Sequence, residues 1–489
     1  MFRHHQALSF LFAAVLACAL PNSATSQVQF TSNTYSSVSG GLDTYSIANG
    51  DFNNDGILDL VTINTSTLSF YAGTGSGGFA SPVSQSIPEN LGQVFAADVT
   101  GDGKLDLVIG GSPSALNQNV TILLGNGDGT FQPGTNIKLD GEAQFITMAD
   151  FNGDHIPDIA VSAYAQKGGA NTQIFLGLGN GKFKRSALLP TFGGGAIVAG
   201  DFNADGKQDI ALLSGGYLVV YLGNGDGTFQ SALVSPQNVP VTGGLAVGDF
   251  FGDHIQTLAV LNQVTQGPGG PITYYVDTVQ YKDGALVSTK PQVASTDEYF
   301  TFIAAGDLNG DFKDDIVLVG GDERNGVPLT AYMLGNGNGT FQRYQSLPAY
   351  GAAETFPFVR DLNLDSRHDI GVAWDASYGN GGSGALVLLN ESAKTNCDPP
   401  PANALSVHVC NPTDGQKIGA TYTFKAAGNA FNGVAKRMEL WIDGAKVGEY
   451  LEDQLKITTT LTKGSHTAAF VVVDTFDNTA SQSVTFNVN

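Results

Sequence analysis

The sequence is poor in cysteine, methionine and tryptophan, with 3, 4 and 2 of these residues among 489. Charged residues make up only 14%, and 45 acidic residues outnumber 23 basic ones, giving a formal net charge of −22 at pH 7. So few basic residues exclude a nucleic-acid-binding surface built on positive charge, whereas the acidic excess permits cation binding. The 63 glycines indicate many short strands and tight turns rather than helices.

Long apolar runs are also missing. The run near the N-terminus, residues 7–20, is too short to span a bilayer comfortably. It follows Arg3 and precedes small residues, a pattern that predicts a secretory signal peptide over residues 1–26, cut before Gln27. A second interpretation is a lipoprotein, with Cys18 as the lipidation site. Both predict a secreted, periplasmic or cell-surface protein without a transmembrane segment.

Catalytic motifs are absent as well. The sequence contains no P-loop, no H-E-x-x-H, no G-x-S-x-G and no kinase signature, so we expect no enzyme activity. After removal of the signal peptide only Cys397 and Cys410 remain. Two cysteines this close in an exported chain most simply form one disulfide.

The sequence does contain an internal repeat. The stretch DFNADGKQDI has seven related copies, spaced 47 to 58 residues apart, and a glycine-rich stretch such as LGNGDGTFQ follows several of them. Each unit reads as strand, acidic loop, strand, strand, glycine hairpin, strand, which predicts an all-β, seven-bladed propeller. The copies begin at Asp51, Asp98, Asp150, Asp201, Asp249, Asp307 and Asp361.

The seventh unit lacks its last strand, and the beginning of the mature chain can replace it. Residues 28–38 resemble the glycine-hairpin strand of the other units. We therefore expect them to form the outer strand of the last blade, which would remove open sheet edges.

Six acidic loops have the composition of calcium sites. Positions 1, 3, 5 and 9 offer side-chain oxygens, position 7 offers its backbone carbonyl, and calcium takes 6–8 oxygen ligands. The fifth loop, at Asp249, has Phe251 at position 3 and Thr257 at position 9, so we expect it to bind calcium poorly, leaving about six sites. The expected ligands are Asp51, Asn53, Asp55, Ile57 and Asp59; Asp98, Thr100, Asp102, Lys104 and Asp106; Asp150, Asn152, Asp154, Ile156 and Asp158; Asp201, Asn203, Asp205, Lys207 and Asp209; Asp307, Asn309, Asp311, Lys313 and Asp315; and Asp361, Asn363, Asp365, Arg367 and Asp369.

Two of these loops carry a histidine, His155 at position 6 and His368 at position 8. We expect both side chains to face solvent and not to bind a metal. Position 6, normally glycine, is His155, Phe312 or Ser366 in three of the six loops, and this predicts weaker sites there.

The pattern D-x-N-x-D-G-x-x-D-[IL] together with LGNGDGTF resembles FG-GAP repeats, also called VCBS repeats, and is similar to the seven-bladed propeller of integrin α-subunits. The predicted propeller domain spans residues 27–392. The resemblance implies that the calcium loops join the first and second strands of each blade on one face. It implies little about function, because such propellers occur in adhesins, lectins and enzyme-associated modules.

A second domain follows a proline-rich linker, residues 393–403. Short alternating strands over residues 404–489 predict a β-sandwich that resembles bacterial immunoglobulin-like domains. We expect Trp441 in its core and the Cys397–Cys410 bridge to tie the linker to its first strand.

The leading functional hypothesis is a calcium-binding adhesion or ligand-binding module for protein or glycan, outside the cell or at its surface. The alternatives are a carbohydrate-active enzyme or enzyme-associated module that uses the propeller face, and a structural envelope protein. The sequence predicts neither the ligand nor the oligomeric state. Aromatic residues near strand ends that could line a ligand site, unless they serve only strand packing, are Tyr164, Tyr217, Tyr274, Tyr275, Trp374 and Tyr378.

Overall fold

The computed structural model describes most of the chain from residue 28 onward. All 38 strands and no helix lie in this part, so none of its segments is a helix able to cross a membrane. The expected signal peptide, Cys18 and most of the linker at residues 393–403 lie outside the described residues. The described residues are 28–36, 44–64, 66–87, 92–110, 119–164, 170–192, 194–238, 244–265, 272–289, 291–296, 298–322, 328–347, 356–374, 384–391, 397, 400, 404–430, 435–451 and 453–489.

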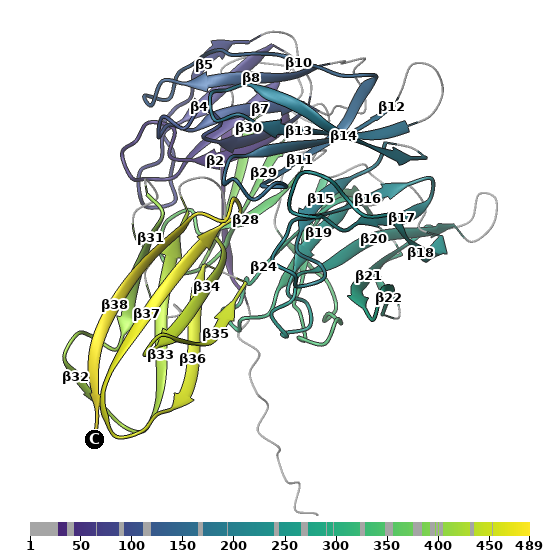
Figure 1. Ribbon diagram of the computed structural model, residues 1–489. Helices are drawn as coiled ribbons and strands as arrows, with labels where there is room; N and C mark the ends of the chain where they lie inside the picture. The colour runs from purple at the N-terminus through teal and green to yellow at the C-terminus, as the bar shows by residue number, and fades with distance from the viewer. Residues whose placement is uncertain are drawn as a thin grey trace, which may run out of the picture.

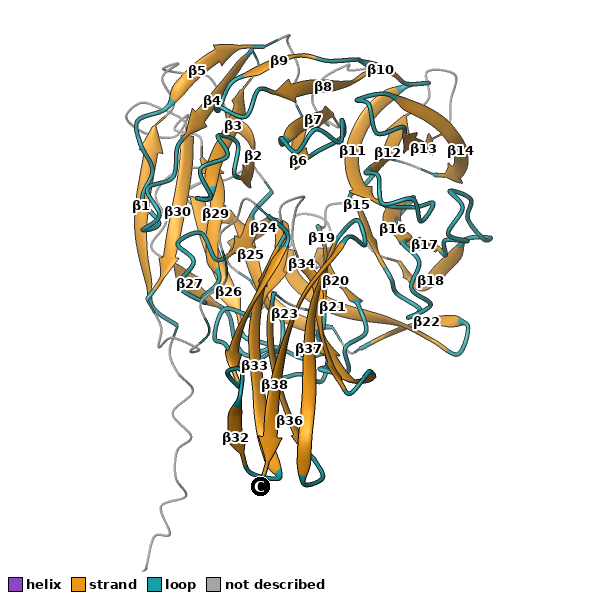
Figure 2. Cartoon of the chain, turned by 60° about the vertical axis from the view of Figure 1, so that its left-hand side comes forward, coloured by secondary structure: helices purple, strands orange, loops and turns teal. Residues whose placement is uncertain are grey.

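Seven antiparallel sheets of four or five strands surround a central axis (Figure 2). This is the all-β arrangement predicted from the repeats, with one acidic loop in each sheet. The first four blades are β2 (Thr44–Gly50), β3 (Asp59–Asn64), β4 (Thr67–Tyr71) and β5 (Val83–Ser86); β6 (Gln93–Ala97), β7 (Asp106–Gly110), β8 (Asn119–Gly125), β9 (Phe131–Pro133) and β10 (Ile137–Lys138); β11 (Glu142–Ala149), β12 (Asp158–Tyr164), β13 (Ala170–Gly177) and β14 (Phe183–Thr191); and β15 (Ile197–Gly200), β16 (Asp209–Ser214), β17 (Tyr217–Tyr221) and β18 (Leu233–Asn238). The last three are β19 (Leu245–Gly248), β20 (Thr257–Thr265), β21 (Ile272–Lys282), β22 (Ala285–Ser288) and β23 (Gln292–Ser295); β24 (Glu298–Gly306), β25 (Asp315–Asp322), β26 (Pro328–Met333) and β27 (Gln345–Leu347); and β28 (Phe358–Arg360), β29 (Asp369–Trp374), β30 (Gly384–Asn390) and β1 (Phe30–Ser36).

The apolar residues of the blades pack between neighbouring sheets. In β3, β7 and β16 every residue is buried, because the second strand of a blade is covered on both faces by adjacent blades. Separate hydrophobic clusters join each blade to the next. A further cluster joins Ile47 and Leu60 of blade one to Ala373 and Val387 of blade seven, so the first and last blades are neighbours.

Strand β1 completes the last blade. It pairs antiparallel with β30 from Phe30 opposite Asn390 to Ser36 opposite Gly384. This confirms the predicted outer strand over Phe30–Ser36; residues 28 and 29 are described but lie before the strand, and residues 37 and 38 lie outside the described part. The outer edge of β30 is thereby paired rather than exposed.

All seven acidic loops lie at the same end of the blades. Each joins the first strand of its blade to the second, as from β15 to β16 in blade four. The glycine hairpins lie at this end too, since Ile210 at the start of β16 pairs with Tyr221 at the end of β17. We call this end of the propeller the loop face.

The C-terminal domain is a two-sheet sandwich, beside the propeller in Figure 1. Phe424, Phe470 and Phe486 lie at the centre of its core. Trp441, expected in this core, is instead half-buried and donates its indole N–H to Glu439 over 2.8 Å. The strands are β31 (Ser406–Asn411), β33 (Thr421–Asn429) and β36 (Gln454–Thr460) in one sheet, and β32 (Gln416–Ile418), β38 (Thr479–Val488), β37 (Gly464–Asp474), β34 (Ala435–Ile442) and β35 (Ala445–Tyr450) in the other.

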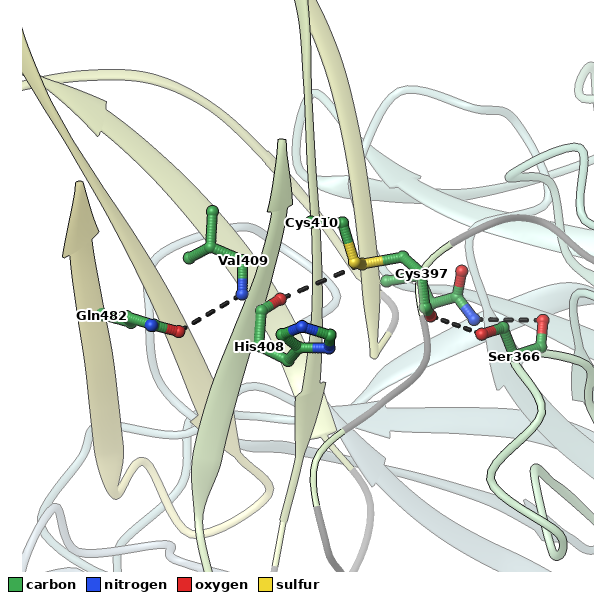
Figure 3. Close-up of a disulfide and its surroundings, with 7 residues drawn as sticks. Ser366, Cys397, His408, Val409, Cys410 and Gln482 are labelled. Atoms are coloured by element: carbon green, nitrogen blue, oxygen red, sulfur yellow. Dashed lines mark hydrogen bonds between the residues drawn. A yellow bond between two sulfur atoms is a disulfide. The ribbon is translucent and has the colours of Figure 1, made fainter. Parts of the chain in front are cut away.

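A disulfide joins Cys397 to Cys410 in β31 (Figure 3). It ties the linker, at Cys397, to the first strand of the sandwich and does not connect the two sheets. The backbone carbonyl of Cys397 also accepts a hydrogen bond from the hydroxyl of Ser366 in the seventh acidic loop (Figure 3). The linker is therefore attached to both domains.

Candidate metal loops and the domain contact

The first aspartate of every acidic loop organises the turn. One oxygen of Asp201 accepts the backbone N–H of Gly206 over 2.8 Å, and the other accepts that of Asp205 over 3.0 Å. The bond to the N–H of position 6 recurs in all seven loops. The Asx-type turn therefore explains the spacing of Asp and Asn without any ligand.

The aspartate at position 9 joins three parts of its blade. Asp209 lies at the start of β16, is fully buried, and accepts N–H groups from Phe202 and Gly223 over 2.9 and 2.8 Å. Five other loops repeat this pair of bonds at 2.7 to 3.0 Å. This carboxylate thus ties the acidic loop to the end of the third strand, a role that the sequence motif did not indicate.

Burial in this acidic setting disfavours the charged form of the position-9 aspartates. Desolvation outweighs the two N–H donors, and the acids at positions 1 and 5 add repulsion, so that the pKa of Asp209 rises to about 7. Asp59 and Asp158 reach a pKa of about 7 and Asp106 about 6 for the same reasons. The loops therefore hold carboxylates that a nearby cation would stabilise.

The lysine side chains of the loops lie at their surface, whereas that of Arg367 is largely buried. Their partner is the position-5 carboxylate: the Lys104–Asp102 and Lys313–Asp311 pairs are 3.4 Å apart and Lys207–Asp205 is 3.8 Å. Arg367 pairs likewise with Asp365. Lysine therefore does not neutralise the buried acids.

The donor set fits a hard cation such as calcium. Each loop offers only oxygen ligands, and an oxygen that accepts one N–H keeps a second lone pair. In the described residues, however, no three acidic, histidine or cysteine side chains converge on one point, because the carboxylates are turned toward backbone N–H groups. The residues that would hold the ion are those at positions 1, 3, 5, 7 and 9 given above, and cation binding remains a prediction.

The fifth loop lacks the oxygen-bearing side chain that the other loops have at position 3 and the aspartate that they have at position 9. Thr257 replaces the position-9 aspartate and donates its hydroxyl to the carbonyl of Gly248 over 2.9 Å. Phe251 takes the place of the position-3 amide. A carboxylate from the next blade, Asp314, accepts the N–H of Asp249 over 2.6 Å. The fifth loop therefore has fewer oxygen donors of its own than the others.

The sandwich lies against the loop face, and this corrects one sequence prediction. His368 does not face solvent: its ring lies 3.3 Å from Asp453 of the sandwich, with 12% of the side chain exposed. Burial lowers its pKa, but the carboxylates of Asp453, Asp307 and Asp361 outweigh burial and raise it to about 9. His155 does keep an exposed side chain, at 54%, while its Nδ1 lies 3.1 Å from the carbonyl of Phe476.

An apolar anchor and a buried arginine complete the domain contact. Phe476, in the turn between β37 and β38, is 3% exposed and packs into the cluster shared by blades two and three. Arg360 of β28 is buried and donates to the side chain of Asn429 and the carbonyl of Ala430, both at 3.3 Å. Neither contact was indicated by the sequence, because both partners are remote in the chain.

The aromatic residues that were predicted as candidate ligand contacts differ in their exposure. Tyr164 and Tyr217 are 44% and 41% exposed, whereas Tyr274 is buried and Tyr275 half-buried. Tyr378 and the side chain of Trp374 lie outside the described residues. Phe192, which sequence reasoning missed, is 88% exposed.

These three exposed residues lie on neighbouring segments of blades three and four, away from the acidic loops. Phe192 packs against Gly215, which shortly precedes Tyr217, and Tyr164 lies beside Gly194. Tyr164 ends β12, a strand that begins at its acidic loop, so the rings are at the opposite end of the blades. We call Tyr164, Phe192 and Tyr217 the aromatic patch.

Several solved structures are similar to this chain at low identity. Rhamnogalacturonan lyase YesW is 13% identical over 73% of this chain and 75% of its own, with a TM-score of 0.43. AofleA from Arthrobotrys oligospora is 12% identical over 66% and 90%, with a TM-score of 0.37. NanB sialidase from Streptococcus pneumoniae is 10% identical over 73% and 70%, also with a TM-score of 0.37. These values identify no shared activity or ligand.

The repeats themselves are assigned by family comparison. No curated protein matches the chain. The profile of the FG-GAP-like repeat, however, matches residues 51–109, 98–161 and 201–260. These segments hold the first to fifth acidic loops and strands of the first five blades. The chain therefore contains FG-GAP-like repeats over those residues.

Proposed function

We propose that the chain is a calcium-stabilised β-propeller that binds a protein or glycan outside the cell. The observation that supports the cation is the six-fold recurrence of a buried position-9 carboxylate next to other loop acids. A divalent cation supplies positive charge and cross-links the loop; no reaction step depends on it. Its role is to stabilise the fold.

Calcium titration tests this part of the proposal. Calcium should raise the melting temperature and EDTA should lower it, because the folded state alone holds the ligands together. Calorimetry should count about six sites. No shift in either direction, with no heat of binding, would reject the cation.

Two matched variants locate the sites. Asp201→Ala removes the first ligand of the fourth loop and should lower the calcium stoichiometry by one. Asp249→Ala makes the same change in the fifth loop, which has Thr257 in place of the position-9 aspartate, and should leave the stoichiometry unchanged. A lost site in the second variant would mean that the fifth loop binds calcium after all.

The aromatic patch supports ligand binding at the end of the propeller opposite the loops. Exposed aromatic faces favour contacts with the apolar faces of sugars or with protein side chains, and their exposure in a monomer is otherwise unfavourable. Secretion, which the N-terminal sequence predicts, would bring such a patch into contact with extracellular glycans or proteins.

A glycan array on residues 27–489, in calcium and in EDTA, tests the ligand class. Binding to one sugar class that Phe192→Ser abolishes would support a lectin-like propeller. Val83→Ser, at another strongly exposed apolar residue, is the control and should bind normally. A blank array from folded protein would reject glycan binding and favour a protein ligand or a structural envelope role.

A further inference from the structure

Tyr164 and Thr191 lie on the same face of blade three. Both pair with one residue of the strand between them, Ala170: Tyr164 from β12 and Thr191 from β14. Residues that pair directly across a sheet lie on the same face of it. Ile174 and Leu189, at alternate positions of β13 and β14, belong to the cluster between blades three and four, so this face is directed at blade four.

Tyr217 of blade four approaches this face from the other side. It begins β17, and Val219 and Tyr221, at alternate positions of that strand, belong to the same cluster. Tyr217 is therefore directed at blade three. Phe192 lies on the connection between the two blades, and its N–H donates to the hydroxyl of Ser214, the residue that pairs with Tyr217, over 2.7 Å. The aromatic patch thus lies along the edge of the junction between two neighbouring blades (Figure 2).

Thr191 contributes a hydroxyl with no hydrogen-bond partner among the described residues. The residue is 8% exposed, and burying a polar group without a partner is unfavourable. Thr172 and Thr330 also have unpartnered hydroxyls, but both residues are fully buried. Thr191 is nearer the surface and directly precedes Phe192, whose 88% exposed side chain has little packing to hold it in place. A molecule that displaces this ring would reach the hydroxyl and supply the missing partner.

The strand segments that form the junction carry no charged side chain, although the whole chain has a net charge of −22. Lys167, the nearest charged residue along the sequence, lies outside the described residues. A charged ligand would therefore gain no ion pair from these segments, and the acidic chain would repel an anionic one. The segments without Asp, Glu, Lys or Arg are residues 159–164, 170–176, 187–192, 194–198 and 210–219.

The axis of the propeller is less open to a ligand than this junction. The ring of Phe356, just before β28, lies 5.9 Å from that of Phe145 in blade three and 4.4 Å from that of Phe302 in blade six. Because blades three and six lie on opposite sides of the ring of blades, these side chains meet across the axis. At the loop face, Leu451 of the sandwich and Val247 of β19 line one cavity of about 230 Å³, so the sandwich covers that end.

We propose that the aromatic patch and Thr191 form a binding site for an uncharged sugar residue of a glycan. The aromatic rings pack against the C–H face of the sugar, and the Thr191 hydroxyl pairs with a sugar hydroxyl. An uncharged ligand rich in hydroxyls matches a junction that offers rings and hydroxyls but no charge. This inference rests on the proposed function and narrows its ligand from a protein or glycan to a neutral glycan.

A glycan array that carries both neutral and acidic glycans tests the ligand class with the whole secreted chain. Glycans that end in galactose, mannose or fucose are the neutral probes, and glycans that end in sialic acid or a uronic acid are the acidic ones. We expect binding to a neutral class and none to the acidic glycans. Preference for the acidic glycans would overturn the uncharged site.

Thr191→Val tests the hydroxyl without disturbing the fold. Valine keeps the shape of the side chain, and the hydroxyl has no partner to lose in the protein itself, so the melting temperature should not fall. The affinity for the glycan that binds best, measured by calorimetry, should fall roughly 5-fold because one hydrogen bond is lost. Thr330→Val, which removes an unpartnered hydroxyl from blade six, is the control and should bind like the unchanged protein.

The outcomes distinguish this inference from the proposed function. Equal affinity of the Thr191→Val variant and the unchanged protein would overturn the role of Thr191 in the site. A blank array from folded protein would overturn the sugar site as a whole. Neither result would affect the calcium-stabilised propeller, which the calcium titration tests separately.

Discussion

At the scale of single residues, the position-9 aspartates do more than the motif indicates. In Asp209 both oxygens are engaged by buried backbone N–H groups from separate segments. The residue is therefore part of the blade's framework as well as a candidate cation ligand. Removing it should destabilise the protein even when no cation is present.

Asp209→Ala should lower the free energy of unfolding by about 2 kcal/mol in EDTA, because two buried N–H groups lose their acceptor at about 1–3 kcal/mol each. The variant no longer has to bury a carboxylate, and this favourable change offsets part of the lost free energy. Asp205→Ala, in the same loop but exposed, should change it by less than about 0.5 kcal/mol. Urea unfolding of both variants in EDTA measures the difference. Equal changes in the free energy of unfolding for the two variants would contradict the structural role of Asp209.

A second residue-scale prediction concerns a buried carboxylate outside the loops. Asp277 in β21 is 3% exposed, and its pKa is raised mainly by burial, despite a 2.7 Å hydrogen bond from Asn262. A raised pKa means that the folded state favours the protonated form, so this group costs stability as pH rises above the ordinary aspartate value near 4. Asp277→Asn should therefore raise the melting temperature at pH 7 and change it little at pH 3. A larger increase in melting temperature at pH 3 than at pH 7 would contradict a raised pKa for Asp277.

At the scale of secondary-structure elements, β1 connects the start of the described chain to its seventh blade. Its residues pair with β30, and Phe30 packs against the cluster between blades six and seven. Without β1 the edge of β30 would expose unpaired backbone groups.

A chain that begins at residue 37 should lose at least about 5 °C of melting temperature, which for a domain of this size corresponds to one or two kcal/mol. It should also aggregate more readily, as light scattering would detect. A chain that begins at residue 28 keeps β1 and is the control. Equal stability of the two chains would contradict the role of β1.

At the scale of the whole molecule, the two domains are in contact through Phe476 of the sandwich, which is buried in the propeller. Phe476→Ala should weaken docking by about 3 kcal/mol, the lower end of the cost of such a substitution in a core. Each domain should still fold, since Phe476 lies outside the sandwich core. Scattering in calcium should then report a longer molecule, whereas Phe192→Ala, at an exposed position, should leave the radius unchanged.

The repeat sequence by itself determined the architecture. Copies such as the one at Asp201 place two hydrophobic strands around a turn whose Asp, Asn and Gly satisfy local backbone groups. Because these interactions are local, the blades, their number and the role of the strand Phe30–Ser36 could be predicted from the sequence. The ligand set of each loop was predicted in the same way, and only an experiment with a cation can test it.

The tertiary structure alone decided what surrounds those loops. His368 was expected in solvent because its position in the motif points outward, yet Asp453, remote in the sequence, covers it. The burial of Phe476 and the contacts of the side chains at position 6 also depend on segments that are remote in the sequence. Local sequence sets the direction of a side chain, but its burial and charge environment depend on which distant segment packs against it, and that is decided only when the two domains meet.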